Sequence, residues 1–239
     1  MTGSLVRMLG LGTRELVAFT GAGGKSTLML ALGVELAGAG EHVLVTTTTK
    51  MGRAQLDGLP AVCRSEDRDA VTAAVAANSL VALATGGDDH KATGPPPGVI
   101  DALFRSVPVD YLLVEADGAH GRSLKAPGPH EPVIPAEATT VVVLMGVGAV
   151  GGRIADVAHR PEQVVILTGL GVRDTLEVDH CVTVLTHPQG GLKGIPPGAR
   201  VVVALTETGT PAAEEAATQI VERLGLCERI SRVVMVEDG

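Results

Sequence analysis

The chain is organised around the stretch Thr20-Gly21-Ala22-Gly23-Gly24-Lys25-Ser26-Thr27, here called the glycine loop. The apolar run 16–19 precedes this loop, and the apolar, helix-favouring segment 28–36 follows it. A strand, a glycine-rich loop and a helix in this order are the context of a phosphate-binding loop. The glycines let the backbone turn tightly, so consecutive N–H groups can point at one anion, and the helix start adds the positive end of its dipole. The stretch predicts a nucleotide-binding site.

The glycine loop also predicts which groups hold the nucleotide. Its backbone would surround the phosphates, the Lys25 ammonium would reach the terminal phosphates, and the Ser26 hydroxyl would ligate magnesium. The residues expected to bind the nucleotide here are Gly21, Ala22, Gly23, Gly24, Lys25, Ser26 and Thr27. The alternative interpretation is a glycine-rich strand-to-helix turn with one solvated lysine.

The loop departs from the full G-x-x-x-x-G-K-[ST] pattern, because Phe19 stands where that pattern has its first glycine. The shorter form G-x-x-G-K-S-T is similar to the loop of the Mur ligases and the folylpolyglutamate synthetases. A ligase of this kind is a further alternative. Those enzymes are modular, however, and we do not expect their separate substrate domains in 239 residues.

Composition excludes several classes of function. The length of 239 residues is typical of one α/β domain, so residues 1–239 are expected to form a single domain. A formal charge of −8, no Trp, one Tyr and two Phe argue against nucleic-acid binding by phosphate neutralisation or base stacking. The three separated cysteines lack a C-x-x-C pattern, which predicts unpaired thiols in a reducing compartment. Without a signal-peptide layout or an apolar run of about 18 residues, we expect a cytoplasmic protein with no membrane partner.

Apolar, β-branched runs alternate with helix-favouring segments along the whole chain. We expect strands at residues 16–19, 43–49, 80–85, 109–114, 139–145, 200–205 and 232–236. We expect helices at residues 5–12, 28–36, 67–77, 161–171, 176–185 and 211–224. Strands that are apolar on both faces and separated by helices predict a three-layer α/β fold of the P-loop NTPase kind, a mostly parallel sheet with helices on both faces. In such a sheet, ligands bind at the carboxyl ends of the strands where the strand order reverses.

Two acids close the strand expected at 109–114. Glu115 and Asp117 lie two residues apart, so on an extended chain they face the same side. An apolar strand ending in acids is where P-loop proteins hold magnesium or position the attacking water. We therefore take Lys25, Glu115 and Asp117 as candidate catalytic residues, and Ser26, Glu115 and Asp117 as candidate magnesium ligands. The sequence does not decide which acid has which role, and two ordinary acids entering a loop are the alternative.

A threonine run with a lysine ends the strand expected at 43–49. The hydroxyls of Thr46–Thr49 and the Lys50 ammonium would add polar groups and charge beside the phosphates. The alternative is a threonine-rich strand followed by a solvated lysine. The guanine-reading Asn-Lys-x-Asp of many P-loop GTPases is missing after the strand at 200–205, where Thr206-Glu207-Thr208-Gly209 stands. The expected ligands are Mg2+ with ATP or GTP, with a slight preference for ATP.

Residues 118–135 form the longest irregular stretch, here called the proline loop after its four prolines. Arg122, Lys125, His130 and Glu131 give it anion-binding and proton-transfer chemistry. Because it leaves the two acids directly, we interpret it as the second-substrate or partner-sensing loop, which nucleotide state would reorder. A proline-rich surface loop is the alternative. The spacing of His120, His130 and Glu131 matches no common zinc pattern.

Two other glycine-rich stretches have the look of sites but are interpreted differently. Residues 146–151 satisfy G-x-G-x-x-G after a strand, but Pro161 excludes the long helix that a dinucleotide site requires. Residues 187–191 are expected to form a turn.

Five runs in this order resemble the YqeC-like family of selenium-dependent hydroxylase accessory proteins. They are GAGGKST (21–27), TTTTKM (46–51), EADG (115–118), LKAP (124–127) and HEPVIP (130–135), with weaker support from HRPE (159–162). The resemblance implies a P-loop accessory protein for the maturation of molybdenum-containing hydroxylases, including those that use a labile selenium. Its implied partner is a client molybdenum hydroxylase or a cofactor-maturation enzyme.

The resemblance supplies no reaction, so two functions stay open. The first is an enzyme that hydrolyses Mg·NTP or transfers its phosphoryl group. The second is a non-catalytic, nucleotide-dependent switch or docking protein.

Overall fold

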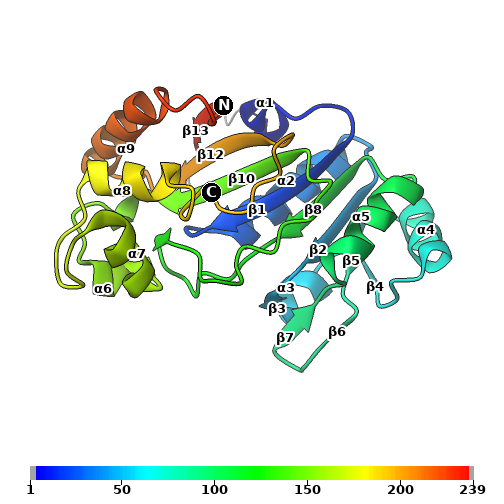
Figure 1. Cartoon of the computed structure of the whole chain (residues 1–239). Helices are drawn as coiled ribbons and strands as arrows, with labels where there is room; N and C mark the ends of the chain where they lie inside the picture. Colours follow the sequence, from blue (N-terminus) through cyan, green and yellow to red (C-terminus); the bar gives the residue numbers. More distant parts are fainter. Residues whose placement is uncertain (1–3, 237–239) are drawn as a thin grey trace.

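The computed structural model describes residues 4–236. Its centre is an eight-stranded sheet (Figure 1). The strands are β1 (Glu15–Gly21), β2 (Val43–Thr47), β4 (Ala61–Cys63), β5 (Leu80–Leu83), β8 (Tyr111–Glu115), β10 (Thr140–Gly146), β12 (Arg200–Thr206) and β13 (Arg232–Met235). Their order across the sheet is β13-β12-β10-β1-β8-β2-β5-β4, and every neighbouring pair is parallel.

Helices cover both faces of this sheet. One face packs against α1 (Leu5–Leu9), α2 (Lys25–Gly38) and α3 (Arg53–Asp57). The other face packs against α4 (Arg68–Ala77), α5 (Pro97–Ser106), α6 (Ile154–Val157), α7 (Pro161–Thr168), α8 (Val178–Thr186) and α9 (Pro211–Leu224). The three-layer α/β fold and the mostly parallel sheet are thus confirmed.

Side-chain alternation along the central strands builds two separate cores. Leu16 and Ala18 of β1 lie in the core under α4–α9, whereas Val17 and Phe19 lie in the core under α1–α3. Successive residues of a strand point to opposite faces, and both faces are covered, so the strands read as continuous apolar runs. This burial rigidly places the carboxyl ends of the strands, where the candidate site lies.

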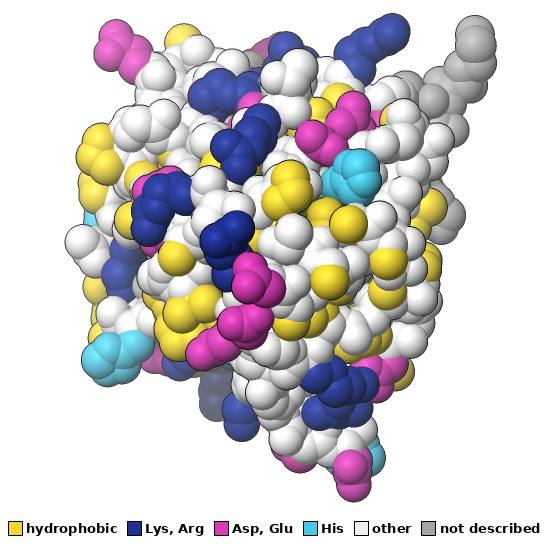
Figure 2. Space-filling model, turned by 90° about the vertical axis from the view of Figure 1, so that its right-hand side faces the viewer, with side chains coloured by type: hydrophobic (Ala, Val, Ile, Leu, Met, Phe, Trp, Pro, Cys, Tyr) yellow, Lys and Arg dark blue, Asp and Glu magenta, His cyan; other side chains and the backbone are white. Residues whose placement is uncertain are grey.

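Two small sheets flank the central one. The first is antiparallel and consists of β3 (Lys50–Gly52), β7 (Lys91–Thr93) and β6 (Gly86–Gly87). It forms the lowest part of the molecule in Figures 1 and 2. The second is parallel and joins β9 (Leu124–Lys125) to β11 (Ala158–His159). It ties the proline loop to the segment before α7.

Several expected elements differ in extent from the observed ones. The strand expected at 43–49 ends at Thr47, and the chain then turns into β3. The helix expected at 5–12 ends at Leu9, because Gly10 adopts the left-handed conformation, φ 66°, that closes a helix. The helix expected at 161–171 ends at Thr168 for the same reason, with Gly169 at φ 75°. Residues 147–149 form a short 3-10 helix (η1), and 187–191 form the expected turn.

The strand order places the glycine loop at a reversal point. The chain leaves β1 through α2 and reaches β2 on one side, passing β8, whereas β10 lies on the other side of β1. In open α/β sheets, ligands bind in the crevice at such a point. The glycine loop, Glu115 and Asp117 all leave the sheet there (Figure 1).

Figure 2 shows the edge of the molecule formed around α4, α5 and β4. On this face, positively and negatively charged side chains are interspersed, so the face carries no continuous basic surface. Within residues 4–236, no helix has the length and apolar character needed to cross a bilayer.

Candidate functional site

The glycine loop follows its path because two of its glycines pack against β10. Gly21 and Gly23 have φ values of 87° and 89°, in the left-handed region that is strained for any residue with a side chain. A Cβ on Gly21 would lie 2.3 Å from the carbonyl oxygen of Leu144, and one on Gly23 would lie 2.3 Å from the amide nitrogen of Gly146. Only glycine fits at these two positions, and the close packing fixes where α2 begins.

Three N–H groups of the loop are engaged within the protein. Gly21 donates to Asp117 Oδ2 at 3.2 Å, Ala22 to the Leu144 carbonyl at 3.0 Å, and Gly23 to the Arg122 carbonyl at 3.0 Å. By contrast, the N–H groups of residues 24–27 donate no hydrogen bond to any described residue. The cradle that can face an anion is therefore the start of α2, residues 24–27, which also carries the positive end of the helix dipole.

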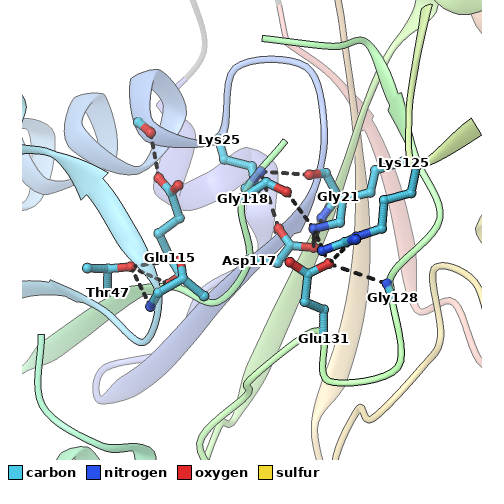
Figure 3. A network of polar contacts seen from close by, with 12 residues as sticks. Gly21, Lys25, Thr47, Glu115, Asp117, Gly118, Lys125, Gly128 and Glu131 are labelled. Atoms are coloured by element: carbon cyan, nitrogen blue, oxygen red, sulfur yellow. Dashed lines mark hydrogen bonds and ion pairs between the residues drawn. The ribbon is translucent and has the colours of Figure 1, made fainter. Parts of the chain in front are cut away.

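Lys25 lies inside the site rather than in solvent. Its side chain is 4% exposed, and its Nζ donates to the Gly21 carbonyl at 2.6 Å and lies 3.2 Å from Asp117 Oδ1 (Figure 3). Asp117 Oδ1 is buried and accepts no hydrogen bond from a described residue, so this contact is an ion pair without hydrogen-bond geometry. The Lys25 ammonium is thus held at the mouth of the loop by a hydrogen bond to the Gly21 carbonyl and by the charge of Asp117.

Ser26 and Glu115, two of the residues expected to hold magnesium, are in direct contact. The Ser26 hydroxyl donates to Glu115 Oε2 at 2.5 Å, and Glu115 is 5% exposed. Burial raises the pKa of the Glu115 carboxyl, while Lys25 and the Ser26 hydrogen bond act against that rise. A hydroxyl and a carboxylate are hard oxygen ligands of the kind that Mg2+ takes, usually with phosphate oxygens and waters.

No group of three or more His, Cys, Asp or Glu side chains suited to a metal occurs within residues 4–236.

Asp117 lies between two ammonium groups. Besides Lys25, its Oδ2 lies 3.2 Å from Nζ of Lys125, whose side chain is fully buried. The Lys125 ammonium also donates to the Gly118 carbonyl at 2.5 Å and lies 3.0 Å from Glu131 Oε2. Lys125 was expected as an anion-binding group of an irregular loop, but the structure places it in β9 as the buried centre of an ion-pair network (Figure 3). We call Lys25, Asp117, Lys125, Glu131 and Arg160 the ion-pair network.

Glu131 and Arg160 end the network. Arg160 Nε donates to Glu131 Oε2 at 2.9 Å, and the Gly128 N–H donates to the same oxygen at 3.3 Å. Burial alone would raise the pKa of the Glu131 carboxyl, but Arg160 and Lys125 outweigh it and lower that pKa to about 2. Glu131 is therefore a fixed anion rather than the proton-transfer group that the sequence allowed.

The side chains of the remaining expected residues make no contact with the glycine loop among the described residues. Lys50 is exposed at the start of β3, and no contact joins it to the glycine loop within residues 4–236. Arg122 donates from Nη1 to the Asp156 carbonyl, and His130 is exposed. The threonine run mainly anchors backbone: Thr47 Oγ1 donates to the Glu115 carbonyl at 2.9 Å and Thr48 Oγ1 to the Val133 carbonyl at 2.7 Å.

Three functional contacts are not apparent from sequence reasoning. Thr206 Oγ1 at the end of β12 donates to the Gly23 carbonyl at 2.8 Å, so it helps to fix the backbone of the glycine loop. The charge of Lys91 in β7 acts to lower the pKa of Glu115, after the larger effects of burial, Lys25 and Ser26. Arg160 reaches Glu131 because β11 pairs with β9. Of these residues, only Arg160 was singled out in the sequence, as part of the HRPE run (159–162) of the family resemblance.

A small cavity of about 10 Å3 lies behind Asp117. Thr20, Asp117, Lys125, Leu185 and Gly190 contribute to its lining. Thr20 Oγ1 and Asp117 Oδ1 are buried without a hydrogen-bond partner among the described residues. A cavity of this volume holds about one water molecule, which would satisfy both atoms.

The chain is similar to one family of proteins. A sequence model of that family, described as "YqeC protein", matches residues 17–162, more than half of the chain. A protein of Escherichia coli (strain K12) named "Uncharacterized protein YqeC" is 34% identical over 187 residues, which cover 78% of this chain and 73% of the relative. The matched range of the family runs from β1 to α7 and so contains the glycine loop, both acids and the whole ion-pair network.

Proposed function

This chain belongs to the YqeC family, and we propose that it is a magnesium-dependent nucleotide-binding protein that hydrolyses ATP or GTP or transfers its phosphoryl group. In this role it acts as an accessory protein for the maturation of molybdenum- or selenium-dependent hydroxylases. The nucleotide part of the proposal rests on the site, and the maturation part rests on the resemblance of the sequence motifs alone.

One observation carries the nucleotide proposal. The N–H groups of residues 24–27, which have no partner among the described residues, converge with the Lys25 ammonium and the Ser26–Glu115 pair at the carboxyl end of β1. Backbone donors and an ammonium supply positive potential for a polyphosphate, and a hydroxyl next to a carboxylate supplies oxygens for a divalent cation. An ordinary strand-to-helix turn has no reason to bury a lysine and two acids together.

Each residue has a distinct role in the proposed reaction. Ser26 and Glu115 would hold magnesium, which supplies charge neutralisation of the phosphate oxygens when bound. Lys25 binds the terminal phosphate and stabilises the charge that develops on it. Asp117 holds Lys25 in place, because its carboxylate lies 3.2 Å from the ammonium and is itself fixed by the Gly21 N–H.

Calorimetric titration of ATP and GTP, each with magnesium, tests nucleotide binding and base preference together. Wild type is expected to bind at least one of them, and Lys25→Ala is expected to lose most of that affinity. Arg64→Ala is the matched control, because Arg64 is an exposed cation whose partner is Asp57 on α3. Equal affinity in wild type and Lys25→Ala would remove the proposal.

Phosphate release then tests turnover. The enzyme proposal expects release that is lost in Lys25→Ala and Asp117→Asn at unchanged fold. Equal release by wild type and Lys25→Ala, with and without a hydroxylase extract, rules out hydrolysis at this site.

The ion-pair network favours a second candidate, a non-catalytic switch. Through Asp117, Lys25 of the glycine loop is linked to Lys125 and Glu131 of the proline loop (Figure 3). A phosphate that draws the Lys25 ammonium away from Asp117 changes the charge balance around Lys125, and so biases the loop. Nucleotide would then control which surface the proline loop presents to a client hydroxylase or a cofactor-maturation enzyme.

Hydrogen exchange separates the switch from the enzyme. The switch expects nucleotide-dependent protection of residues 118–135 with negligible turnover. Unchanged protection of this loop on adding Mg·ATP or Mg·GTP eliminates the switch, whereas turnover that saturates with a small-molecule acceptor favours the enzyme.

A further inference from the structure

Two histidines meet Arg160 at the end of the ion-pair network, and the proposed nucleotide site assigns no role to the histidines or to the Nη groups of Arg160. His120 follows the strand β8 and its acids, and His159 ends β11. Their imidazole rings are 4.7 Å apart, centroid to centroid, and nearly perpendicular, at 79°. Because β11 pairs with β9 in the register Lys125↔His159, His159 lies next to the buried lysine of the network. Arg160 follows directly in the chain.

The backbone at this place is unusual. Only three non-glycine residues in the described chain have positive φ: His120 at 49°, Arg160 at 59° and Glu207 at 58°. Left-handed backbone is costly for residues with a side chain, and such residues concentrate at functional sites. Two of the three thus lie in this one cluster, here called the His–Arg cluster (His120, His159 and Arg160).

Donor groups of the cluster remain unused by the protein. Among the described residues, Arg160 donates only through Nε, to Glu131, and its two Nη groups have no partner. Its guanidinium packs on Gly128, where a Cβ would lie 3.0 Å from both Cζ and Nε, so the side chain is fixed in place. No ring nitrogen of His120 or His159 makes a hydrogen bond within residues 4–236. Fixed arginine donors beside imidazoles are the usual protein groups for binding an oxyanion.

The electrostatic environment points the same way. Burial lowers the pKa of His159, and the charges of Lys125, His120 and Arg160 lower it further, with only Glu131 opposing them. The same positive potential that disfavours an imidazolium there favours an anion.

We propose that the His–Arg cluster is a binding subsite for an oxyanionic group, a phosphate or a carboxylate, of the second molecule that this protein handles. The assignment of that oxyanion to a second substrate rests on the proposed nucleotide function; the existence of the subsite does not. Its position fits the role. The cluster is joined to the glycine loop by the short segment after Asp117, and the Arg122 carbonyl of the same segment accepts a hydrogen bond from the Gly23 N–H.

The test titrates inorganic phosphate, and separately acetate, into Lys25→Ala protein at constant ionic strength. This variant weakens anion binding at the glycine loop, so the remaining response reports the subsite. Histidine imidazole signals are followed by NMR, with His42 as the internal standard, because it pairs with Asp110 at the amino ends of β2 and β8, opposite the carboxyl ends where the site lies. The expected result is a saturable shift of His120 and His159 with at least one of the two anions, together with a rise in the pKa of His159. The anion that binds more tightly identifies the chemistry of the group.

Two variants in the Lys25→Ala background complete the test. Arg160→Gln is expected to weaken phosphate binding about tenfold or more. Arg160→Lys keeps the positive charge but loses the paired N–H donors of the planar guanidinium, so it is expected to weaken binding less. Thermal melting confirms that each variant is folded. If Arg160→Gln does not fold, His159→Asn takes its place, with the same expected loss.

Two results overturn the proposal. In the first, neither anion shifts the signals of His120 and His159 more than it shifts that of His42. In the second, the shift seen in wild type disappears in Lys25→Ala, since the anion then occupies the glycine loop alone.

Discussion

Glu131→Gln is expected to destabilise the protein in a pH-dependent way whose size follows from the ion-pair network. Lys125 and Arg160 lower the pKa of the Glu131 carboxyl from 4.5 to about 2, against the opposing effect of its burial. The carboxylate is 19% exposed, so solvent screens these pairs only in part. A difference of this size between the folded and unfolded pKa corresponds to about 3 kcal/mol of stability at pH 7.

The sign of the pH dependence is fixed by the direction of the shift. Because the folded-state pKa lies below the unfolded-state value, the stabilisation is present above about pH 4.5 and is lost as the pH falls toward about 2. At pH 3 roughly half of it should remain. Glu131→Gln lacks this titration, so the difference between wild type and variant should shrink over the same range.

Urea unfolding of both proteins at pH 7, 5, 4 and 3 measures this difference. Glu137→Gln is the matched control, because Glu137 follows in the same segment but pairs with Arg105 at the surface, where the side chains are 37% and 57% exposed. Exposed pairs contribute about 0–1 kcal/mol, so this control should change stability little at any pH. A Glu131→Gln loss below about 1 kcal/mol at pH 7, or a loss that stays constant down to pH 3, would refute the reasoning.

Three other outcomes are expected. Gly23→Ala should abolish nucleotide binding and lower the free energy of unfolding in urea by about 2 kcal/mol or more, because φ is 89° and the new Cβ would lie 2.3 Å from the Gly146 nitrogen. In the control Gly38→Ala, the new Cβ has nothing within 4 Å, so the free energy of unfolding should stay the same or rise slightly. Equal effects of the two substitutions would contradict the packing argument. Ser26→Ala should leave nucleotide binding measurable by calorimetry but remove most of its magnesium dependence, and an unchanged dependence would place the cation elsewhere. Burial raises the pKa of the Cys181 thiol to about 12, so in the folded protein a thiol reagent should leave Cys181 unmodified while it reacts at Cys227; rapid modification of Cys181 would show that its helix opens readily.

The parts of the fold that sequence predicts well are those with a local cause. The inner strands of the central sheet, such as β1, β8 and β10, are buried on both faces, so each appears as an apolar run independently of its neighbours. The pairing of Ser26 with Glu115 was also predictable, because parallel strands end at the same edge of the sheet. The packing that requires glycine at positions 21 and 23 was not predictable, because it involves Leu144 and Gly146, more than a hundred residues away in the sequence.

The elements missed by sequence analysis include short helices, very short strands, among them β4 at the edge of the central sheet, and the longer helix α5. The strands β3, β6 and β7 have two or three residues each and are largely exposed, so no hydrophobic pattern marks them. Helix α5, in contrast, carries a visible signal. It begins with Pro97, a residue favoured in the first turn, and buries Ile100, Leu103 and Phe104 at helical spacing. That helix was predictable from these residues, whereas the small antiparallel sheet was not.

The surroundings of the proline-loop side chains were not predictable, because burial is a property of the fold. Lys125 and Glu131 stand among prolines in the sequence, and the sequence predicted anion-binding and proton-transfer chemistry for this loop. In the structure these two side chains form an ion pair, with Lys125 Nζ 3.0 Å from Glu131 Oε2. The donors that remain free among the described residues of this cluster belong to Arg160 and the two histidines. Pairing of β9 with β11 brings these groups together, and two-residue strands leave no trace in a sequence.

Asp117 is the point where the two halves of the site depend on each other. The network contains three cations, Lys25, Lys125 and Arg160, and two carboxylates, so one positive charge is in surplus. An incoming phosphate meets that surplus first at Lys25, the network member that lies in the glycine loop. If Lys25 moves toward the phosphate, Asp117 keeps Lys125 as its remaining ion-pair partner. Lys125 also donates a hydrogen bond to the Gly118 carbonyl. Because these groups are buried, the change is weakly screened, and we expect the proline loop to respond to it. The same contact would then serve both proposed functions, so turnover and hydrogen exchange of residues 118–135 must be measured together to separate them.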